Sequence, residues 1–245
     1  MFRAEIEGDE TSLEIIRKNF EDYISVEVGK YYFTCPKFQR VSMIDIFSFA
    51  EEKLNHISCL LNLKHIKLGN VNLGVIENVK EDGKKEILAV VRGTHTEVKF
   101  SSHAHGFTDE ELGENQVFDL HKVPEDLNYY LKCMDENNLI RDAVKYFNKE
   151  FNWVNLFKVY EIIDHDMGGK KGIVNQDWAT DAEIDLFKCT AHNVRGAGED
   201  ARHAVESKIN DRCRGVLSSH DPIELVTAIS LVKKILSNWI EFKCL

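Results

Sequence analysis

Residues 70–100 read NVNLGVIENVKEDGKKEILAVVRGTHTEVKF. Two runs of β-type sequence, 70–79 and 85–100, flank the dipeptide Asp82-Gly83. Alternation of apolar and polar residues is typical of a half-buried strand, and Asp-Gly tolerates the positive φ angles of a tight turn. The stretch therefore predicts a β-hairpin, and YYFTC at 31–35 predicts a further short strand.

Residues 42–63 give the one clear helical pattern in the first half of the chain. Apolar residues recur there at steps of three and four, as on the buried side of a helix: Ile46, Phe49, Ala50, Leu54, Ile57, Leu60 and Leu61. With the hairpin, this pattern predicts a small mixed α/β unit over residues 1–125. Residues 101–125 show no clear period and predict a connecting loop.

After residue 125 nearly every pattern is helical. Thr180 and Glu183 form a capping box that predicts a helix to about Asn193, and Gly168-Gly169 predicts the end of the helix before it. Asp221 and Pro222 predict the start of the last helix. We therefore expect an α+β protein in which a helical bundle, residues 126–245, follows the mixed unit.

Composition narrows the classes of function. A chain of 245 residues with 43% hydrophobic residues can bury a core, and a net charge of −10 argues against non-specific coating of nucleic acid. The N-terminus has no apolar run of signal-peptide length, and no segment approaches the roughly 20 apolar residues of a membrane span. We expect a soluble, cytoplasmic protein without membrane contact.

The six cysteines, at positions 35, 59, 133, 189, 213 and 244, contain no CxxC pair. We expect reduced, mostly buried thiols and no structural zinc, because the two-plus-two ligand spacing is missing. His95, His103 and His105 form another candidate for metal binding, since an HxH pair places two imidazoles on one side of a strand. The alternative, a polar loop rich in histidine, is favoured because no Cys or carboxylate ligand is apparent. No metal and no cofactor are therefore expected.

The helix that contains Trp153 ends in Tyr160, Glu161, Asp164 and His165. Residues four apart share a helix face, so carboxylates and an imidazole lie on adjacent faces. A solvated helix end is the favoured interpretation, because the macrodipole alone favours His165 there. In the alternative, Glu161 faces the bundle interior as the partner of an arginine.

The highest concentration of reactive side chains lies in residues 187–204, FKCTAHNVRGAGEDARHA. His192 and Asn193 end one helix, Gly196 and Gly198 turn the chain, and a new helix is expected from Glu199, with Arg202 and His203 in its first turn. A helix start attracts anions, so a phosphate is a natural ligand there. In the structural alternative, Arg202 and His203 bind buried carboxylates such as Glu161 or Asp164.

Residues 126–245 resemble a HEPN-type helical domain of bacterial conflict and defence proteins. The resemblance rests on the order of NLFKVYEII (155–163), IDLFKCTAHN (184–193), ARHA (201–204) and a closing helix that ends in WIEFK (239–243). It implies a homodimer that cleaves RNA without a metal, or binds RNA or a nucleotide phosphate. Arg195 and His203 are separated by seven residues, one more than the family motif allows, and Asn193 precedes the arginine.

In the mechanism that the resemblance implies, His203 acts as general acid or base, and Arg195 or Arg202 stabilises the phosphorane charge. Asn193, His192 and Glu161 are the expected substrate-binding residues. An imidazole titrates near neutral pH, which suits both proton transfers. The alternative is a non-catalytic HEPN-like binding or dimerisation module in which Arg202 and His203 are structural.

Overall fold

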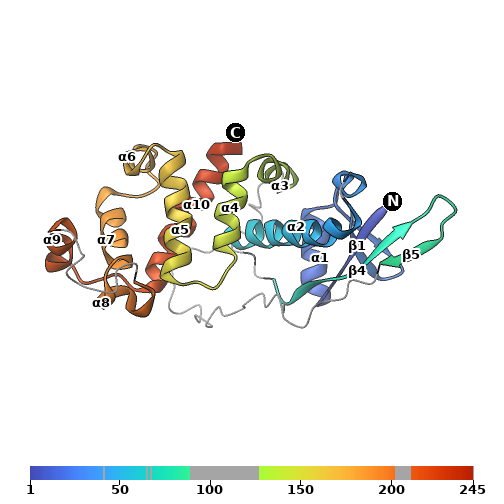
Figure 1. Cartoon of the computed structure of the whole chain (residues 1–245), viewed down its shortest axis with the longest axis horizontal. Helices are drawn as coiled ribbons and strands as arrows, with labels where there is room; N and C mark the ends of the chain where they lie inside the picture. Colours follow the sequence, from blue (N-terminus) through green and yellow to red (C-terminus); the bar gives the residue numbers. More distant parts are fainter. Residues whose placement is uncertain (41, 65, 67, 89–126, 202–210, 245) are drawn as a thin grey trace. The chain divides into compact units, whose positions relative to one another are not determined.

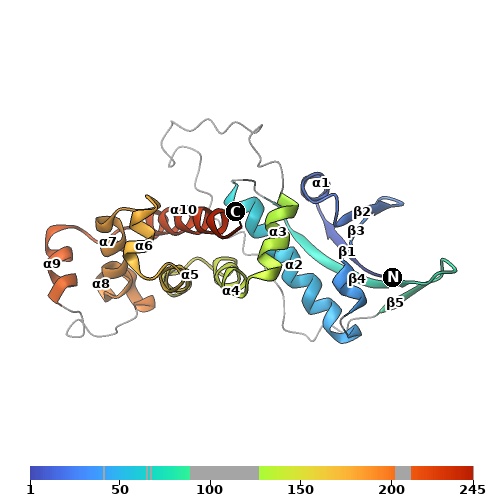
Figure 2. The same cartoon turned by 90° about the horizontal axis from the view of Figure 1, so that it is seen from above.

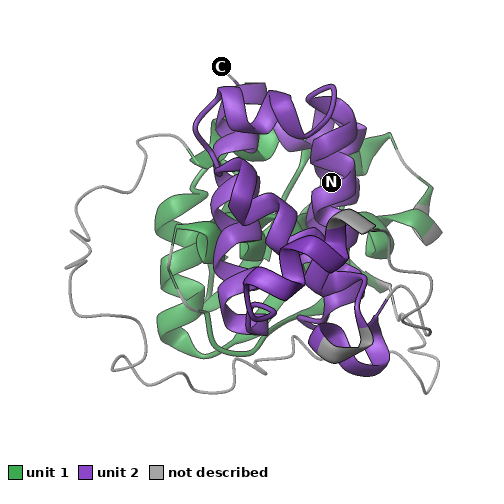
Figure 3. Cartoon of the chain, turned by 90° about the vertical axis from the view of Figure 1, so that its left-hand side faces the viewer, with its two compact units in different colours: residues 1–132 green, residues 133–245 purple. Residues whose placement is uncertain are grey.

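The computed structural model describes residues 1–245 except 41, 65, 67, 89–126, 202–210 and 245. Two compact units, residues 1–132 and 133–245, divide the chain (Figure 3). The first contains an antiparallel sheet with helices and the second is helical, which confirms the α+β class. The boundary expected after residue 125 lies outside the described residues.

An antiparallel sheet of five strands, in the order β2-β3-β1-β4-β5, organises the first unit. The strands are β1 (Phe2–Gly8), β2 (Ile24–Glu27), β3 (Lys30–Phe33), β4 (Val71–Val79) and β5 (Lys85–Leu88). The expected hairpin is confirmed: β4 pairs with β5, and Gly83 has a φ of 80° in the turn. The Lys84 amide donates to the Asp82 carboxylate at 3.0 Å. The remainder of the predicted strand at 85–100 lies outside the described residues.

Helices α1 (Glu10–Asn19) and α2 (Met43–Leu63) and the short 3₁₀ helix η1 (Pro36–Gln39) complete the described part of this unit. Helix α2 confirms the prediction at 42–63, and it packs against β4 (Figure 2). Helix α1 begins after Asp9, whose carboxylate accepts the Ser12 amide at 2.9 Å. The apolar side of the sheet and α2 share a core that includes Ala4, Ile6, Ile46, Ala50, Ile57 and Ile76.

The second unit is built around α5 (Trp153–Asp166), which packs against α4 (Asn138–Phe147), α7 (Asp181–Ala191) and α10 (Leu225–Cys244) (Figure 1). The other helices are α3 (Leu127–Glu136), which crosses the division between the units, α6 (Lys170–Asn175), α8 (Val194–Ala197), the 3₁₀ turn η2 (Gly198–Asp200) and α9 (Asp211–Ser219). Apolar side chains of α5 and α10, including Val159, Ile163, Val232, Leu236 and Trp239, are buried between them.

Two of the helix boundaries predicted in this unit are confirmed here. Helix α5 ends at Asp166, ahead of Gly168 and Gly169 with φ angles of 72° and 103°. The Thr180 capping box starts α7. The predicted start of the last helix at Asp221 and Pro222 is wrong, because α10 begins at Leu225. The Ile223 amide instead donates to Thr190 Oγ1 at 3.2 Å, which attaches this segment to α7.

The cysteines differ from the expectation of reduced thiols. Cys133 pairs with Cys244 and Cys189 with Cys213, while Cys35 and Cys59 are free and buried. The paired cysteines lie 111 and 24 residues apart in the sequence, so no short sequence motif predicts the pairing. Among the described helices, none is long and apolar enough to cross a membrane.

Candidate functional site at the end of α7

The turn that follows α7 is held in place by backbone hydrogen bonds. His192 is the C-cap residue of α7, and the carbonyl of Asn193 accepts the amides of Gly196 at 3.0 Å and Ala197 at 2.8 Å. Asn193 is buried. The Asn193 amide donates to the Thr190 carbonyl at 3.0 Å, so Asn193 links the end of α7 to the start of α8, and the chain leaves α7 in one defined direction.

The imidazole of His192 lies against a cluster of aromatic rings. Its ring centroid is 4.9 Å from that of Phe157 on α5. Phe187 stacks on Phe157 at 6.1 Å and meets Tyr160 edge-on at 5.6 Å, and Trp153 lies beside it. His192 itself is half-buried. The aromatic packing therefore fixes the position of the imidazole and buries its Nε2 atom, although the residue as a whole is only half-buried.

Lys188 places a positive charge one turn before His192, on the same side of α7. Its ammonium group lies 5.4 Å from the centroid of the Tyr160 ring. Within the described part of the chain no carboxylate comes within ion-pair distance of Lys188. The attraction of the ring for a cation holds the ammonium group without neutralising it, which leaves a charge for an anionic ligand.

Gly196 closes the turn by a close approach of two segments. A Cβ atom at this position would lie 2.5 Å from Thr190 Cγ2 and 3.1 Å from Pro222 Cβ. Thr190 is fully buried, so it has little room to move. Only glycine therefore fits where α8 packs between the end of α7 and the segment that precedes α10.

The side chains of the three predicted catalytic residues lie outside the described part of the structure. Arg195 belongs to α8, but its side chain is outside the described part of the structure, and so are Arg202 and His203. The expected helix does not begin at Glu199: residues Gly198–Asp200 form a single 3₁₀ turn, and Ala201 is extended, with a φ of −62° and a ψ of 136°. The turn expected to carry Arg202 and His203 lies outside the described residues. Gly198, with a φ of 58°, makes the expected glycine turn.

The polar end of α5 supports the solvated interpretation. Glu161 and His165 are exposed, so the alternative with Glu161 facing the interior is wrong, since Val159, Tyr160 and Ile163 occupy that side. Tyr160 donates to Asp164 at 2.6 Å. Burial, and then this hydrogen bond, raise the pKa of the Tyr160 hydroxyl well above its ordinary value. The hydroxyl therefore stays protonated at neutral pH.

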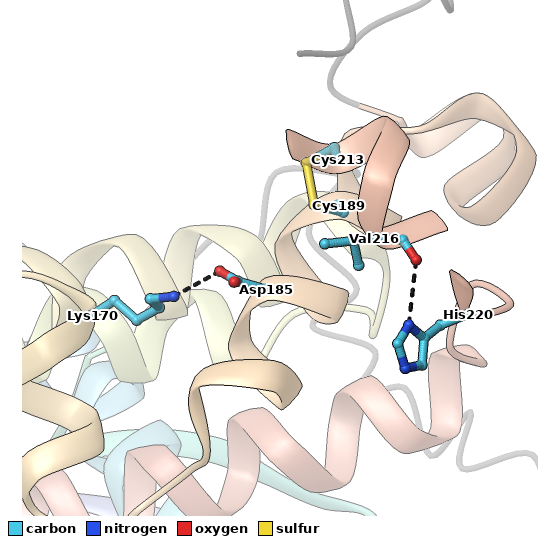
Figure 4. The surroundings of a disulfide bond; sticks show 6 residues. All are labelled: Lys170, Asp185, Cys189, Cys213, Val216 and His220. Atoms are coloured by element: carbon cyan, nitrogen blue, oxygen red, sulfur yellow. Dashed lines mark hydrogen bonds and ion pairs between the residues drawn. A yellow bond between two sulfur atoms is a disulfide. The ribbon is translucent and has the colours of Figure 1, made fainter. Parts of the chain in front are cut away.

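Other carboxylates of this unit hold helices together. Asp166 accepts the Trp239 indole N–H at 2.8 Å and pairs with Lys243 at 3.1 Å, which joins α5 to α10. Asp185 pairs with Lys170 at 2.8 Å and joins α7 to α6 (Figure 4). These residues are engaged in the structure of the bundle rather than presented to a ligand.

A second group of ionisable side chains, the charged sheet cluster, lies on the strands of the first unit and consists of the buried Arg3, Glu5, Glu77 and Tyr32 with the exposed Lys30. Arg3 binds Glu77 through two nitrogens at 2.9 and 2.7 Å, and its guanidinium lies 3.7 Å from the centroid of the Tyr32 ring. Lys30 pairs with Glu5 at 2.7 Å. Each carboxylate of the cluster has a cation beside it.

The candidate metal ligands His95, His103 and His105 lie outside the described residues. In the ranges that the structure describes, no three His, Cys, Asp or Glu side chains come together as a metal site would require. The sequence prediction also missed Lys188, whose spacing of four residues from His192 was the available signal.

Comparisons with protein-family models, curated proteins and solved structures found no match to this chain.

Proposed function

We propose that the helical unit binds RNA or a nucleotide through a phosphate group at the end of α7. The observation that carries this proposal is the pair formed by Lys188 and His192. The ammonium group rests on Tyr160 and the imidazole on Phe157, so a cation and a hydrogen-bonding ring are held on the same side of α7. Such a pair suits a phosphate oxygen.

The frame around the pair supports binding by a preorganised site. Asn193 and Gly196 fix the exit from α7, so Arg195 in α8 starts from a defined backbone position. Preorganised donors bind an anion without having to reorganise. The net charge of −10 favours one local phosphate site over a broad nucleic-acid surface.

Cleavage is a second candidate function for the same segment. The HEPN-like order of helices implies that His203 acts as general acid or base and that Arg195 or Arg202 stabilises the phosphorane. It also implies a homodimer formed through the helical unit and a cytoplasmic role in defence. Lys188 favours this function over metal-dependent hydrolysis, since an ammonium group can stabilise a phosphorane without a metal.

Binding is tested with a fluorescent single-stranded RNA and the full chain in EDTA at low salt. We expect Lys188→Met and Arg195→Ala each to weaken binding about tenfold and to lower the salt slope by about one. Lys171→Met is the matched control, because Lys171 is an exposed cation of the same unit on α6. Equal affinities of all four proteins would overturn the proposed site.

The same samples test cleavage. RNA that is cut in EDTA by the wild type and left intact by His203→Ala and Arg202→Ala supports the catalytic function. RNA that is bound but not cut would show that the protein binds RNA without cleaving it. If Arg202→Ala instead lowers the melting temperature by several degrees and leaves RNA binding unchanged, Arg202 has a structural role.

A further inference from the structure

The disulfide between Cys189 and Cys213 connects α7 to α9 beside the candidate site (Figure 4). It encloses residues 190–212, which include the whole turn after α7. Both cysteines are buried, at 2% and 6% exposure, and among the described hydrophobic side chains the half-buried Val216 and Leu217 pack against them. This small group of side chains is separate from the main core of the unit.

The described side chains of helix α9 contribute little buried apolar surface. Among its described side chains only Cys213 is buried, and its main packing partner is α7. A helix of nine residues is not stable alone in water, because its nucleation cost is spread over too few hydrogen bonds. The position of α9 therefore depends on the covalent link.

The other disulfide, Cys133–Cys244, provides an internal comparison. Helix α3 carries the half-buried Cys133 and also buries Leu127, Leu131 and Met134, and α10 buries a long apolar face against α5. Opening this bond removes a covalent link and leaves both helices with their apolar contacts. Opening Cys133–Cys244 therefore leaves its two helices packed, whereas opening Cys189–Cys213 leaves α9 with little buried apolar surface among its described side chains.

We infer that Cys189–Cys213 is a thiol–disulfide switch that holds α9 and the end of α7 when oxidised and releases them when reduced. A dithiol reductant attacks one sulfur, forms a mixed disulfide and then closes its own ring, so the protein gains two electrons and two protons as two thiols. Oxidised glutathione reverses the reaction through the corresponding mixed disulfide. Disulfides of cytoplasmic proteins are commonly of this reversible kind.

The consequence for ligand binding rests on the proposed function. Cys189 follows Lys188 directly and precedes Asn193 by one helical turn. Loss of the link leaves the end of α7 with one covalent constraint fewer, so the phosphate-binding side chains are less preorganised. The oxidised protein is therefore the tighter binder.

Hydrogen exchange with mass spectrometry tests the switch without any RNA. We expect reduction by dithiothreitol to accelerate exchange in peptides covering 211–219 by about 300-fold, the factor implied by opening a loop of this size. The pair Cys189→Ser and Cys213→Ser should reproduce this in the absence of reductant. The matched control, Cys133→Ser with Cys244→Ser, should keep 211–219 protected until dithiothreitol is added.

Two results would overturn the switch: unchanged exchange in 211–219 on reduction, or equal acceleration in the control without reductant. Differential alkylation in glutathione buffers gives a second measurement on the unmutated chain. It should find Cys189 and Cys213 convertible between thiol and disulfide while 133–244 stays oxidised, and permanent oxidation of both pairs would overturn reversibility. Because neither measurement contains RNA, failure of RNA binding and failure of the switch are separate results.

Discussion

The charged sheet cluster of the first unit and the end of α7 in the second both gather ionisable side chains, but they use them differently. On the sheet, Arg3 meets Glu77 and Lys30 meets Glu5, so charges cancel within the cluster. At the end of α7, Lys188 and His192 are held by aromatic rings. The buried charges of the sheet are thus paired with each other, whereas in the described part of the chain no carboxylate lies within ion-pair distance of Lys188, which is why we propose the binding site at the end of α7.

The sheet cluster also shows how partners set ionisation. Burial alone lowers the pKa of Arg3, but hydrogen bonds to Glu77 and Glu27 outweigh it and raise the pKa above the ordinary value. Hydrogen bonds from Arg3 and Lys85 lower the pKa of Glu27. Both pKa changes favour the ionised forms of Arg3 and Glu27 at neutral pH. The charges of the cluster are therefore engaged with each other rather than with a ligand.

The largest predicted effect belongs to the aromatic support of the α7 site. Phe187 is fully buried between Trp153, Phe157 and Tyr160. Phe187→Ala should lower the free energy of unfolding by about 3–5 kcal/mol in urea denaturation. Phe242→Ala, at a phenylalanine that is 49% exposed, should cost less than about 1 kcal/mol. Similar losses for the two variants would mean that the rings do not hold α7.

The sheet cluster should respond to loss of one partner more than to loss of both. Arg3→Ala leaves Glu77 buried beside no guanidinium, so we expect a loss of about 2–3 kcal/mol in the free energy of unfolding. The double variant Arg3→Met with Glu77→Leu removes both charges and should lose less, measured in the same urea titration. A double variant less stable than the single one would show that the pair itself stabilises the sheet.

A smaller effect is expected at the turn after α7. Gly196→Ala forces Thr190 or Pro222 to move and should cost about 1–3 kcal/mol. It should also weaken RNA binding while leaving every charge in place. Gly215→Ala on α9 is the control: its Cβ would have open space, so the variant should gain about 0.5–1 kcal/mol. Unchanged RNA affinity in Gly196→Ala would show that the turn after α7 does not contribute to RNA binding.

The smallest effect concerns Tyr160 and depends on pH. Because the folded protein raises the pKa of this hydroxyl, folding favours the protonated form, and this stability is present below the unfolded pKa of about 10 and lost as pH rises above it. Tyr160→Phe should cost about 1 kcal/mol at pH 7 and flatten the fall in stability between pH 9 and about 11. Tyr129→Phe, at an exposed tyrosine, is the control and should show the same dependence of unfolding free energy on pH as the wild type. If Tyr160→Phe also kept the wild-type slope above pH 9, the fall in stability could not be assigned to Tyr160.

Much of the fold could be predicted because local signals agreed with it. The Asp82-Gly83 hairpin, α2, the Thr180 capping box and the glycines after α5 all depend on neighbouring residues. Strand β1 was missed because Arg3 and Glu5 resemble a charged terminus, although they alternate with Ala4 and Ile6 as strand residues do. The ion-pair partners of Arg3 and Glu5 lie on other strands, Glu77 on β4 and Lys30 on β3, and the sequence does not reveal these pairings.

The site was less predictable than the fold. His192 and Asn193 were found from their position at a helix end, and the structure adds the rings that support His192. The contact of Lys188 with Tyr160 and the pairing of Cys189 with Cys213 join separate helices. Such contacts depend on tertiary packing, and connectivity among six cysteines cannot be obtained from their spacing.

Cross-linking of bound RNA compares the two regions most directly. Full-length protein is irradiated with 4-thiouridine RNA in EDTA, digested, and the linked peptides are identified by mass spectrometry. We predict links in peptides that cover residues 188–201, at the end of α7, and their loss in Lys188→Met. Links concentrated in β1 or β4 of the charged sheet cluster, or links at the end of α7 that persist in Lys188→Met, would contradict it.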